Sequence, residues 1–458
     1  MTQPALTTDL STPAHDAHVV RRHTGSAAPT NGNANKLDPL DRAAHDWYRF
    51  VLSYPPHLVR RYLDEFGLKS ADIVLDPFCG TGTTLVEAKK LGICSIGLEV
   101  NPFAHFASTA KLDWHVDAAA LKAAANDIAE KVLRKLRRQG IHDDAFFVRN
   151  ADGLILRGLD EATTKLILAN SISPLPLHKA LILLDALREI AHEPYYPHAR
   201  LALANALVFK ISNLHFGPEV GVGKPKPDVA VVVAWLNEVQ KITADLSLLV
   251  DHKRTASQVF NADARRIGEY VKPGTISAVI TSPPYPNEKD YTRTTRLESV
   301  LLGFISSKEE LRSLKKGFVR SNTRGVYKED DDDRWVADHP EINRIAETIE
   351  ARRIELGKTS GFERMYARVT KLYFGGMARH LAELRPLLKP GAQLAYVVGD
   401  QASYLRVMIR TGELLADIAQ SLGYQLKRID LFRTRLATAS REQLREEVVV
   451  LEWPGKNK

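Results

Sequence analysis

"ADIVLDPFCGTGTTLVEAKKLGICSIGLEVNP" occupies residues 71–102 and decides the fold class. It divides into an apolar strand, a glycine-rich turn, a helix and a second apolar strand that ends at Glu99. A βαβ unit of about thirty residues places its two strands parallel in one sheet. The same alternation returns from about residue 256, so the sequence predicts an α/β fold built on a parallel sheet.

The turn "DPFCGTGTT" (76–84) has the features of a cofactor-binding turn. Gly80 and Gly82 permit a tight turn with close backbone approach, and the following helix offers free amide groups. The G-x-G-x-x-G pattern and the lysine of a phosphate loop are both missing. Glu99 can accept hydrogen bonds from both hydroxyls of a ribose. S-adenosylmethionine needs such an acceptor and no phosphate cradle; the alternative is a helix-capping turn with an exposed Glu99.

A third acid follows another short apolar run. Asp263 lies in "VFNADAR" (259–265), and by the same logic it would face the exocyclic amine of the cofactor's adenine. Asp228 and Asp251 compete for this role, because a long helical stretch separates Asp263 from the second strand.

A second motif, "TSPPY" (281–285), follows the apolar run "AVI". Together with "DPFCGTGTT" it resembles the motifs of DNA methyltransferases that modify cytosine N4 or adenine N6. "SYPPHLV" (53–59) is similar to motif X of that family, and "YVVGD" with "ELLADIAQSLGY" resembles a later strand and helix. The likeness covers about residues 39–110, 256–300 and 365–453.

The resemblance implies a doubly wound, seven-stranded α/β sheet of the methyltransferase type, with a helical insertion and a second, smaller insertion. It implies S-adenosyl-L-methionine as cofactor and no metal ion. The implied cofactor-binding residues are Asp76, Pro77, Phe78, Gly80, Gly82, Thr83, Glu99, Asn101 and Asp263.

The composition divides the chain into six segments. Residues 1–38 have no apolar period, which predicts a disordered tail. Ala- and Leu-rich helical patterns fill residues 115–255, where "HFGPEVGVGKPKPD" (215–228) is predicted to be an irregular loop. Residues 305–364 form the second insertion. The methyltransferase part takes residues 39–114 for the cofactor, 256–304 for catalysis and 365–458 for the C-terminal strands and helices.

The resemblance assigns the catalytic role to Ser282, Pro283, Pro284 and Tyr285. An exocyclic amine is a poor nucleophile because its lone pair is delocalised into the ring. Fixed acceptors, the hydroxyl of Ser282 and the carbonyl of Pro283, would favour a pyramidal nitrogen. Proline fixes φ and lacks an N–H, so the acceptors are preorganised. Tyr285 would stack on a base flipped out of the duplex.

The serine also bears on the target base. Within the family, Ser before Pro-Pro-Tyr is commoner among cytosine-N4 enzymes, whereas Asp or Asn is common among adenine-N6 enzymes. The resemblance therefore implies cytosine N4 and leaves adenine N6 open.

Basic residues predict contacts with double-stranded DNA, and the formal net charge of +8 suits a polyanionic partner. Arg293 and Arg296 lie within a few residues of Tyr285 and could hold backbone phosphates. Lys224 and Lys226 lie in the loop of the helical insertion. The second insertion offers Lys315, Lys316, Arg320 and Arg324. A solvated surface is the alternative for both insertion groups, and the acidic run "EDDDD" (329–333) is expected to be an exposed loop.

The remaining composition narrows the class of protein. Two cysteines in 458 residues cannot form a disulfide framework or a zinc site by themselves. The sequence contains no run of about 18 apolar residues, so it predicts no membrane span. The first residues lack the pattern of a signal peptide. We expect a cytoplasmic enzyme. The alternatives are an RNA amino-methyltransferase, a non-catalytic DNA-binding module and a dinucleotide-dependent oxidoreductase. The sequence leaves open whether a cognate restriction or defence nuclease accompanies it.

Overall fold

The computed structural model describes residues 37–50, 53–143, 153–217, 219–287, 289–436 and 443–455. The disordered tail predicted for residues 1–38 lies outside these ranges except for its last two residues. Within the described ranges, no helix is long and apolar enough to cross a membrane.

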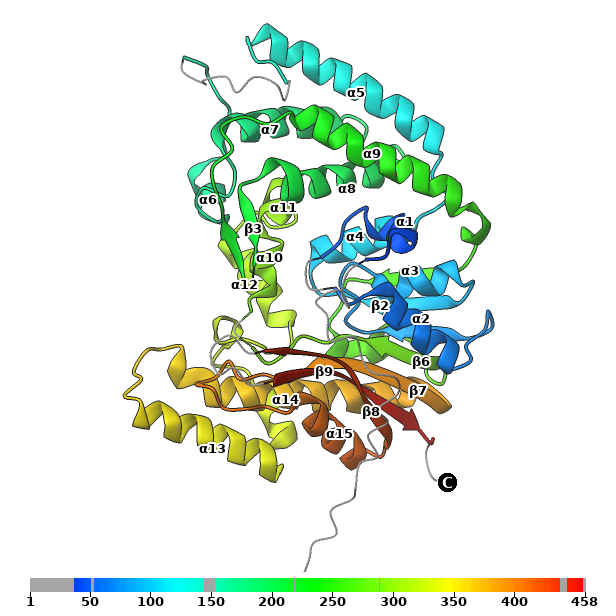
Figure 1. Cartoon of the computed structure of the whole chain (residues 1–458), viewed down its shortest axis with the longest axis vertical. Helices are drawn as coiled ribbons and strands as arrows, with labels where there is room; N and C mark the ends of the chain where they lie inside the picture. The colour runs from blue at the N-terminus through cyan, green and yellow to red at the C-terminus, as the bar shows by residue number, and fades with distance from the viewer. Residues whose placement is uncertain are drawn as a thin grey trace, which may run out of the picture.

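A seven-stranded sheet runs through the lower part of the molecule in Figure 1. In spatial order its strands are β5 (Ser257–Phe260), β2 (Cys94–Leu98), β1 (Ile73–Asp76), β6 (Ile276–Thr281), β7 (Leu388–Gly399), β9 (Gln443–Trp453) and β8 (Gln425–Leu436). The strands from β5 to β7 are parallel, whereas β9 is antiparallel to both of its neighbours. The chain order reverses between β1 and β6, which creates a switch point at their carboxyl ends. The predicted doubly wound α/β sheet is confirmed.

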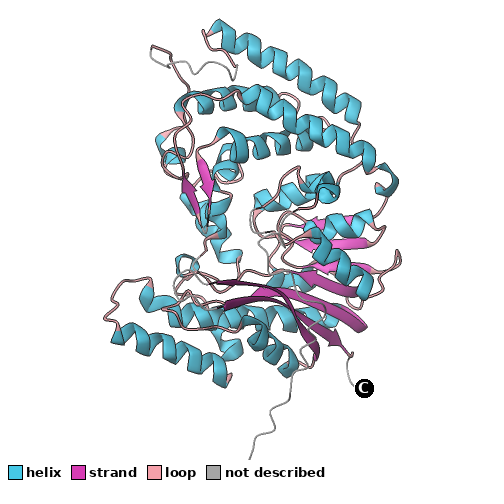
Figure 2. Cartoon of the chain, viewed as in Figure 1, coloured by secondary structure: helices cyan, strands magenta, loops and turns pink. Residues whose placement is uncertain are grey.

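Helices cover both faces of this sheet, as Figure 2 shows. One face carries α2 (Pro56–Glu65), α3 (Thr83–Lys90) and α4 (Pro102–Leu112), and the other carries α14 (Tyr366–Leu384) and α15 (Thr411–Ser421). Because side chains alternate along a strand, Val74 and Ile280 enter the core under α2. Leu75 and Val279, their neighbours in sequence, enter the core under α14. Burial on both faces explains why these strands are continuous apolar runs.

An insertion made mostly of helices lies between β2 and β5 and forms the upper part of Figure 1. Its helices are α5 (Ala118–Arg138), α6 (Glu161–Thr164), α7 (Pro174–Arg188), α8 (Tyr196–Ala206) and α9 (Val231–Leu248). The short helix α1 (Arg42–His45) contacts α9. The buried cluster of α5, α7, α8 and α9 continues into α3 and α4, so the insertion and the sheet share one apolar core.

Part of the loop predicted at residues 215–228 is regular. The strands β3 (Leu214–Phe216) and β4 (Val220–Val222) form a small antiparallel hairpin. The prediction was wrong here because Gly217, one of the residues that suggested a loop, falls between two short strands.

After β6 the catalytic part continues with α10 (Tyr291–Thr294) and α11 (Arg296–Leu301). The second insertion follows and contains α12 (Lys308–Gly317) and α13 (Pro340–Glu355), and α13 packs on α14. The acidic run was expected to be an exposed loop, and this is wrong for two of its aspartates. Asp332 is buried between Arg265 and Arg379, and Asp330 pairs with Arg320 at 2.7 Å. Arginines distant in sequence compensate these charges, which makes their burial tolerable.

Candidate active site

A cavity of about 340 Å³ opens at the carboxyl ends of β1, β2, β5 and β6. Its lining comes from the segments 77–83, 98–101, 262–264 and 282–291, and from residues 317–319 of the second insertion. Ligands of open α/β sheets bind at such a switch point. The two sequence motifs therefore meet in one cavity.

The glycine-rich turn has a backbone that favours glycine. Gly80 and Gly82 have φ angles of +52° and +84°. A Cβ on Gly82 would also lie 3.0 Å from the Cβ of Ser108. Gly82 does not line the cavity but is the N-cap of α3. The predicted residues of this turn that line the cavity are Pro77, Phe78, Gly80 and Thr83.

Glu99 lies in the cavity wall at the end of β2. Its carboxylate accepts hydrogen bonds from the backbone N–H groups of Gly80 (2.8 Å) and Asn101 (2.7 Å). Burial raises the pKa of this carboxyl to about 7. Asn101 also lines the cavity, but its side chain caps α4 and donates to Thr295 Oγ1 at 3.0 Å. Each carboxylate oxygen of Glu99 keeps a lone pair for a ligand hydroxyl.

Asp76, predicted to bind the cofactor, lies behind the cavity wall. Its fully buried carboxylate accepts hydrogen bonds from Thr281 Oγ1 (2.6 Å) and Tyr54 Oη (3.0 Å). Burial raises the pKa of this carboxyl to about 6. Asp76 therefore joins the end of β1 to the end of β6 and to the segment before α2.

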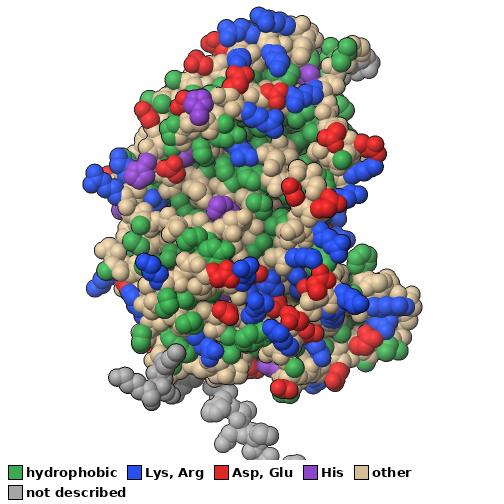
Figure 3. All heavy atoms as spheres, turned by 180° about the vertical axis from the view of Figure 1, so that it is seen from behind, with side chains coloured by type: hydrophobic (Ala, Val, Ile, Leu, Met, Phe, Trp, Pro, Cys, Tyr) green, Lys and Arg blue, Asp and Glu red, His purple; other side chains and the backbone are tan. Residues whose placement is uncertain are grey.

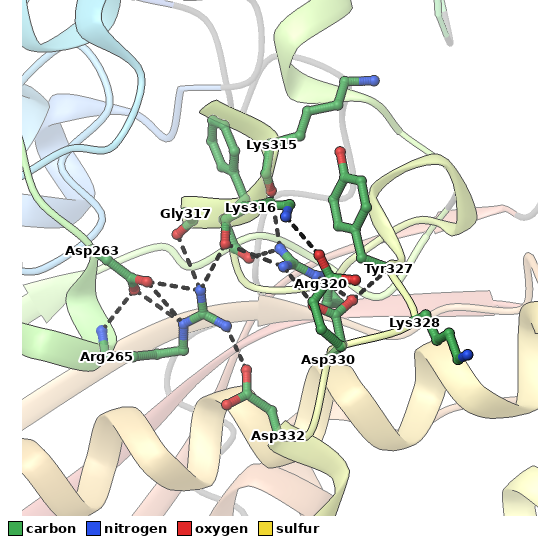
Figure 4. A network of polar contacts seen from close by, with 12 residues as sticks. Asp263, Arg265, Lys315, Lys316, Gly317, Arg320, Tyr327, Lys328, Asp330 and Asp332 are labelled. Atoms are coloured by element: carbon green, nitrogen blue, oxygen red, sulfur yellow. Dashed lines mark hydrogen bonds and ion pairs between the residues drawn. The ribbon is translucent and has the colours of Figure 1, made fainter. Parts of the chain in front are cut away.

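Asp263 lines the cavity after β5, as predicted from its position, whereas its competitors lie elsewhere. Asp228 pairs with Lys179 inside the helical insertion, and Asp251 lies in a short helical turn after α9. The carboxylate of Asp263 accepts hydrogen bonds from three N–H groups of Arg265: the backbone N–H, Nη2 and Nε–H, the last of which is shared between both oxygens. Figure 4 shows this pair and the network around it.

The motif Ser282–Tyr285 lies in the cavity wall directly after β6. Ser282 Oγ donates to the carbonyl of Val397 at 3.2 Å, which leaves the lone pairs of the hydroxyl oxygen available. The backbone N–H of Tyr285 donates to the hydroxyl of Tyr291 at 3.1 Å. A Cβ at Gly399 would lie 3.0 Å from the Tyr285 ring, so the ring rests on the backbone of β7. Ser282, Pro283, Pro284 and Tyr285 all line the cavity.

Comparison with known proteins points to one family. A family model described as DNA methylase (N6_N4_Mtase) matches residues 28–109. The Type II methyltransferase M.BsoBI of Geobacillus stearothermophilus is 26% identical over 450 residues, which cover 90% of this chain and 86% of that protein. These matches support the amino-methylating DNA methyltransferase family as the one that this chain is similar to.

Two further proteins were compared with this chain. The Type II methyltransferase M.AvaI of Nostoc is 24% identical over 92% of this chain and 88% of that protein. The solved rRNA methyltransferase AviRa of Streptomyces viridochromogenes covers 91% of this chain and 94% of its own chain at 10% identity, with a TM-score of 0.31. That score is too low to support any conclusion about function.

The basic residues predicted to bind DNA lie outside the cavity lining. Arg293 is half-buried in α10, and Arg296 donates to the carbonyls of Thr292 (3.1 Å) and Leu166 (3.2 Å). Lys226 donates to the carbonyl of Lys210 at 2.8 Å, whereas Lys224 is exposed. The basic groups of the second insertion have partners of their own: Lys315 pairs with Asp290, Lys316 with Glu329, Arg320 with Asp330, and Arg324 lies over the ring of Phe362.

Sequence reasoning missed several residues that line the cavity. Lys289, Arg433 and Arg435 are the basic residues in the described lining. Lys289 follows Tyr285 by four positions, so the proximity argument used for Arg293 could have found it. Arg433 and Arg435 lie on β8, about 150 residues away along the chain, and no local signal marks them.

Positively charged side chains do not form a separate patch on the face of the molecule seen in Figure 3. Lys and Arg side chains are interspersed there with Asp and Glu side chains. This face is turned away from the view of Figure 1 and carries no single extended basic patch.

Proposed function

We propose that this DNA methyltransferase transfers a methyl group from S-adenosyl-L-methionine to N4 of a cytosine flipped out of double-stranded DNA. The observation that carries the proposal is the shared cavity, in which Glu99 and Ser282 are both lining residues. A cofactor held at Glu99 and an amine held at Ser282 would lie in the same cavity. The double-stranded DNA substrate is proposed from the Type II methyltransferases that the chain resembles over most of its length.

The residues of the turn suit the cofactor. Thr81 lines the cavity, and its buried Oγ1 has no partner among the described residues. A buried hydroxyl without a partner is costly, so a polar ligand atom at this place would be stabilising. Glu99 would accept the ribose hydroxyls, and Gly80 would admit the ligand to close approach. The bound cofactor would supply an electrophilic methyl group on sulfur.

The residues after β6 suit an amine that donates two hydrogen bonds. Ser282 Oγ directs its own hydrogen to Val397, so its lone pairs can accept one N–H of the target amine. The carbonyl of Pro283 would accept the other. The nitrogen lone pair would then be free to form the new N–C bond as the S–C bond breaks. The surplus N–H proton leaves to water, so no strong general base is needed.

Tyr285 would hold the base itself. Its ring rests on β7 and its backbone N–H is held by Tyr291, whose hydroxyl pKa is raised to about 12 by burial. Tyr291 therefore stays protonated. Stacking of a base on an aromatic ring is worth roughly 1–3 kcal/mol. The basic groups at the cavity, Lys289 and Arg435, would meet the phosphates that flank the flipped nucleotide.

The test is transfer of labelled methyl groups to unmethylated genomic DNA, followed by mass analysis of the nucleosides. We expect N4-methylcytosine. Ser282→Ala should lower kcat by about 10²-fold, as for the loss of one preorganised polar group. Tyr285→Ala should lower kcat/KM by roughly 5- to 100-fold through lost stacking, whereas Tyr285→Phe keeps the ring and most activity.

Tyr270→Ala is the matched control, because Tyr270 is an exposed tyrosine outside the cavity and should leave the rate unchanged. N6-methyladenine as product would overturn the base assignment and keep the catalytic residues. Label in RNA but not in DNA would overturn the substrate.

A further inference from the structure

The second insertion reaches the cavity through residues 315–319, here called the strap. Gly317, Phe318 and Val319 line the cavity alongside Glu99 and Asp263. A Cβ on Gly317 would lie 2.8 Å from Cγ1 of Val100, the residue after Glu99. The strap therefore lies directly on the end of β2, beside the place proposed for the ribose.

Two buried arginines hold the strap by its backbone. Arg265 donates to the carbonyls of Lys316 and Gly317, each at 3.3 Å. Arg320 donates to the carbonyls of Lys315 (2.9 Å), Lys316 (3.1 Å) and Phe318 (2.5 Å). The strap begins in the last turn of α12, whose final carbonyls have no partners inside the helix. Cationic groups at this end also meet the negative end of the helix dipole.

Carboxylates in turn fix both arginines, as Figure 4 shows. Arg265 pairs with Asp263 and Asp332, and Arg320 pairs with Asp330 at 2.7 Å. Arg265 and Arg320 are 7% and 5% exposed, so these are internal pairs and not surface ones. Buried pairs with several hydrogen bonds hold a single geometry.

The same network changes the role of Asp263. A carboxylate offers about four lone-pair positions for hydrogen bonds. Three N–H groups of Arg265 already point at the carboxylate of Asp263, and the Nε–H is shared between both oxygens. Asp263 is thus engaged mainly in orienting Arg265.

We propose that the strap is the adenine-side wall of the cofactor cavity, with Phe318 packing against the purine and Arg265 positioning it. Asp263 acts through Arg265, as a positioning residue. This inference rests on the proposed function and names a contact of the same site. The backbone of the strap is held from one side, which leaves the side chains of Phe318 and Val319 to meet the ligand. A rigid aromatic wall gains stacking energy without an ordering cost.

The test is calorimetric titration of the full chain with S-adenosylhomocysteine. Phe318→Ala should weaken Kd by about tenfold, the loss expected for one base–aromatic contact. Phe318→Tyr keeps the ring and should stay within about twofold of the parent protein. Arg265→Ala should weaken binding to a similar extent, and adding Phe318→Ala to it should cost nothing further, because both changes remove one contact.

Two neighbouring variants are matched controls. Arg266→Ala removes an exposed arginine paired with Glu269, and Phe362→Ala removes an exposed phenylalanine. Neither should change Kd. Thermal unfolding of each variant checks the fold, and Phe318→Ala tests the proposal even if Arg265→Ala does not fold.

The outcomes separate this inference from the proposed function. Failure of the unsubstituted protein to bind S-adenosylhomocysteine would overturn the proposed function and this inference with it. Normal binding that Phe318→Ala leaves unchanged would overturn the inference alone. An unchanged Kd with a lower methyl-transfer rate would place the strap at the target base and would also overturn it.

Discussion

Three carboxylates lie at or just after the ends of β1, β2 and β5, and the donors around each of them differ. Asp76 receives hydroxyl donors from Thr281 and Tyr54, and Glu99 receives two backbone N–H groups. Asp263 receives only Arg265. Neutral donors leave the charge of Glu99 uncompensated in a buried place, so its pKa rises to about 7. The same chemical group, a carboxylate, thus has a different role at each of the three strand ends, and its neighbours determine which.

The shifted pKa of Glu99 predicts a pH dependence of cofactor binding. The ionised form offers more acceptor positions to ribose hydroxyls than the protonated form. Affinity for S-adenosylhomocysteine should therefore fall as the pH drops below about 7, by up to about tenfold per pH unit. Calorimetric titrations between pH 5.5 and 8.5 measure this, using the pH of the buffer as the only variable.

Glu99→Gln is the control for this prediction. It should bind weakly at every pH and lose the dependence near pH 7; a slope that persists in the variant would assign the titration to another group. In contrast to the affinity, the contribution of Glu99 to the free energy of unfolding of the cofactor-free protein should grow as the pH falls. The folded-state pKa of Glu99 is raised, so its contribution is present below about 4.5 and lost as the pH rises through about 7.

At the scale of elements, helix α14 packs closely on the acidic run because of two adjacent glycines. A Cβ on Gly375 would lie 1.9 Å from the carbonyl oxygen of Asp332. A Cβ on Gly376 would lie 3.1 Å from Cγ1 of Val319, its nearest atom. These glycines bring the partner of Arg265 and the end of the strap against one helix. Their spacing in sequence gives no hint of it.

Gly375→Ala should destabilise the protein although alanine favours a helix. The clash forces the backbone at Asp332 to move, at about 1–3 kcal/mol or more, against a propensity gain of about 1 kcal/mol. Urea denaturation measures the free energy of unfolding. Gly376→Ala should lose much less stability, because its contact with Val319 can relax by a few tenths of an ångström. Equal stability of the two variants would contradict the close packing of Asp332 on α14.

At the scale of the whole molecule, the helical insertion and the sheet share an apolar core, so we expect them to unfold together. Lys179 lies inside this core region of the insertion, fully buried. Its Nζ pairs with Asp228 (2.6 Å) and Asp143 (3.2 Å), and the carboxylate of Asp143 caps the first N–H groups of α9. The ion pairs thus tie α7 to α9.

Lys179→Met should lower the free energy of unfolding by about 3–5 kcal/mol, because it leaves two buried carboxylates without a cation. Far-ultraviolet circular dichroism and tryptophan fluorescence should report one coincident transition. Lys131→Met, which breaks an exposed pair with Glu189, should cost at most about 1 kcal/mol. Separate transitions for the two probes would mean that the insertion folds as an independent unit.

The sequence by itself determined the βαβ unit, the pairing of the glycine turn with the Ser-Pro-Pro-Tyr motif, and the family that the comparisons confirm. It also placed Glu99 and Ser282 at one edge, since the carboxyl ends of parallel strands meet there. These features depend on residues adjacent in the chain and on a fixed strand geometry.

Only the tertiary structure decided what surrounds those residues. It brought Phe318 to the cavity, engaged Asp263 with Arg265, buried Asp332, and set Arg433 and Arg435 of β8 beside the motif after β6. Apart from the local pair of Asp263 and Arg265, these contacts join segments about 50–150 residues apart. Such contacts depend on how helices and strands pack and not on local periodicity, because a surface arginine and a buried one have the same sequence pattern until their partners are placed.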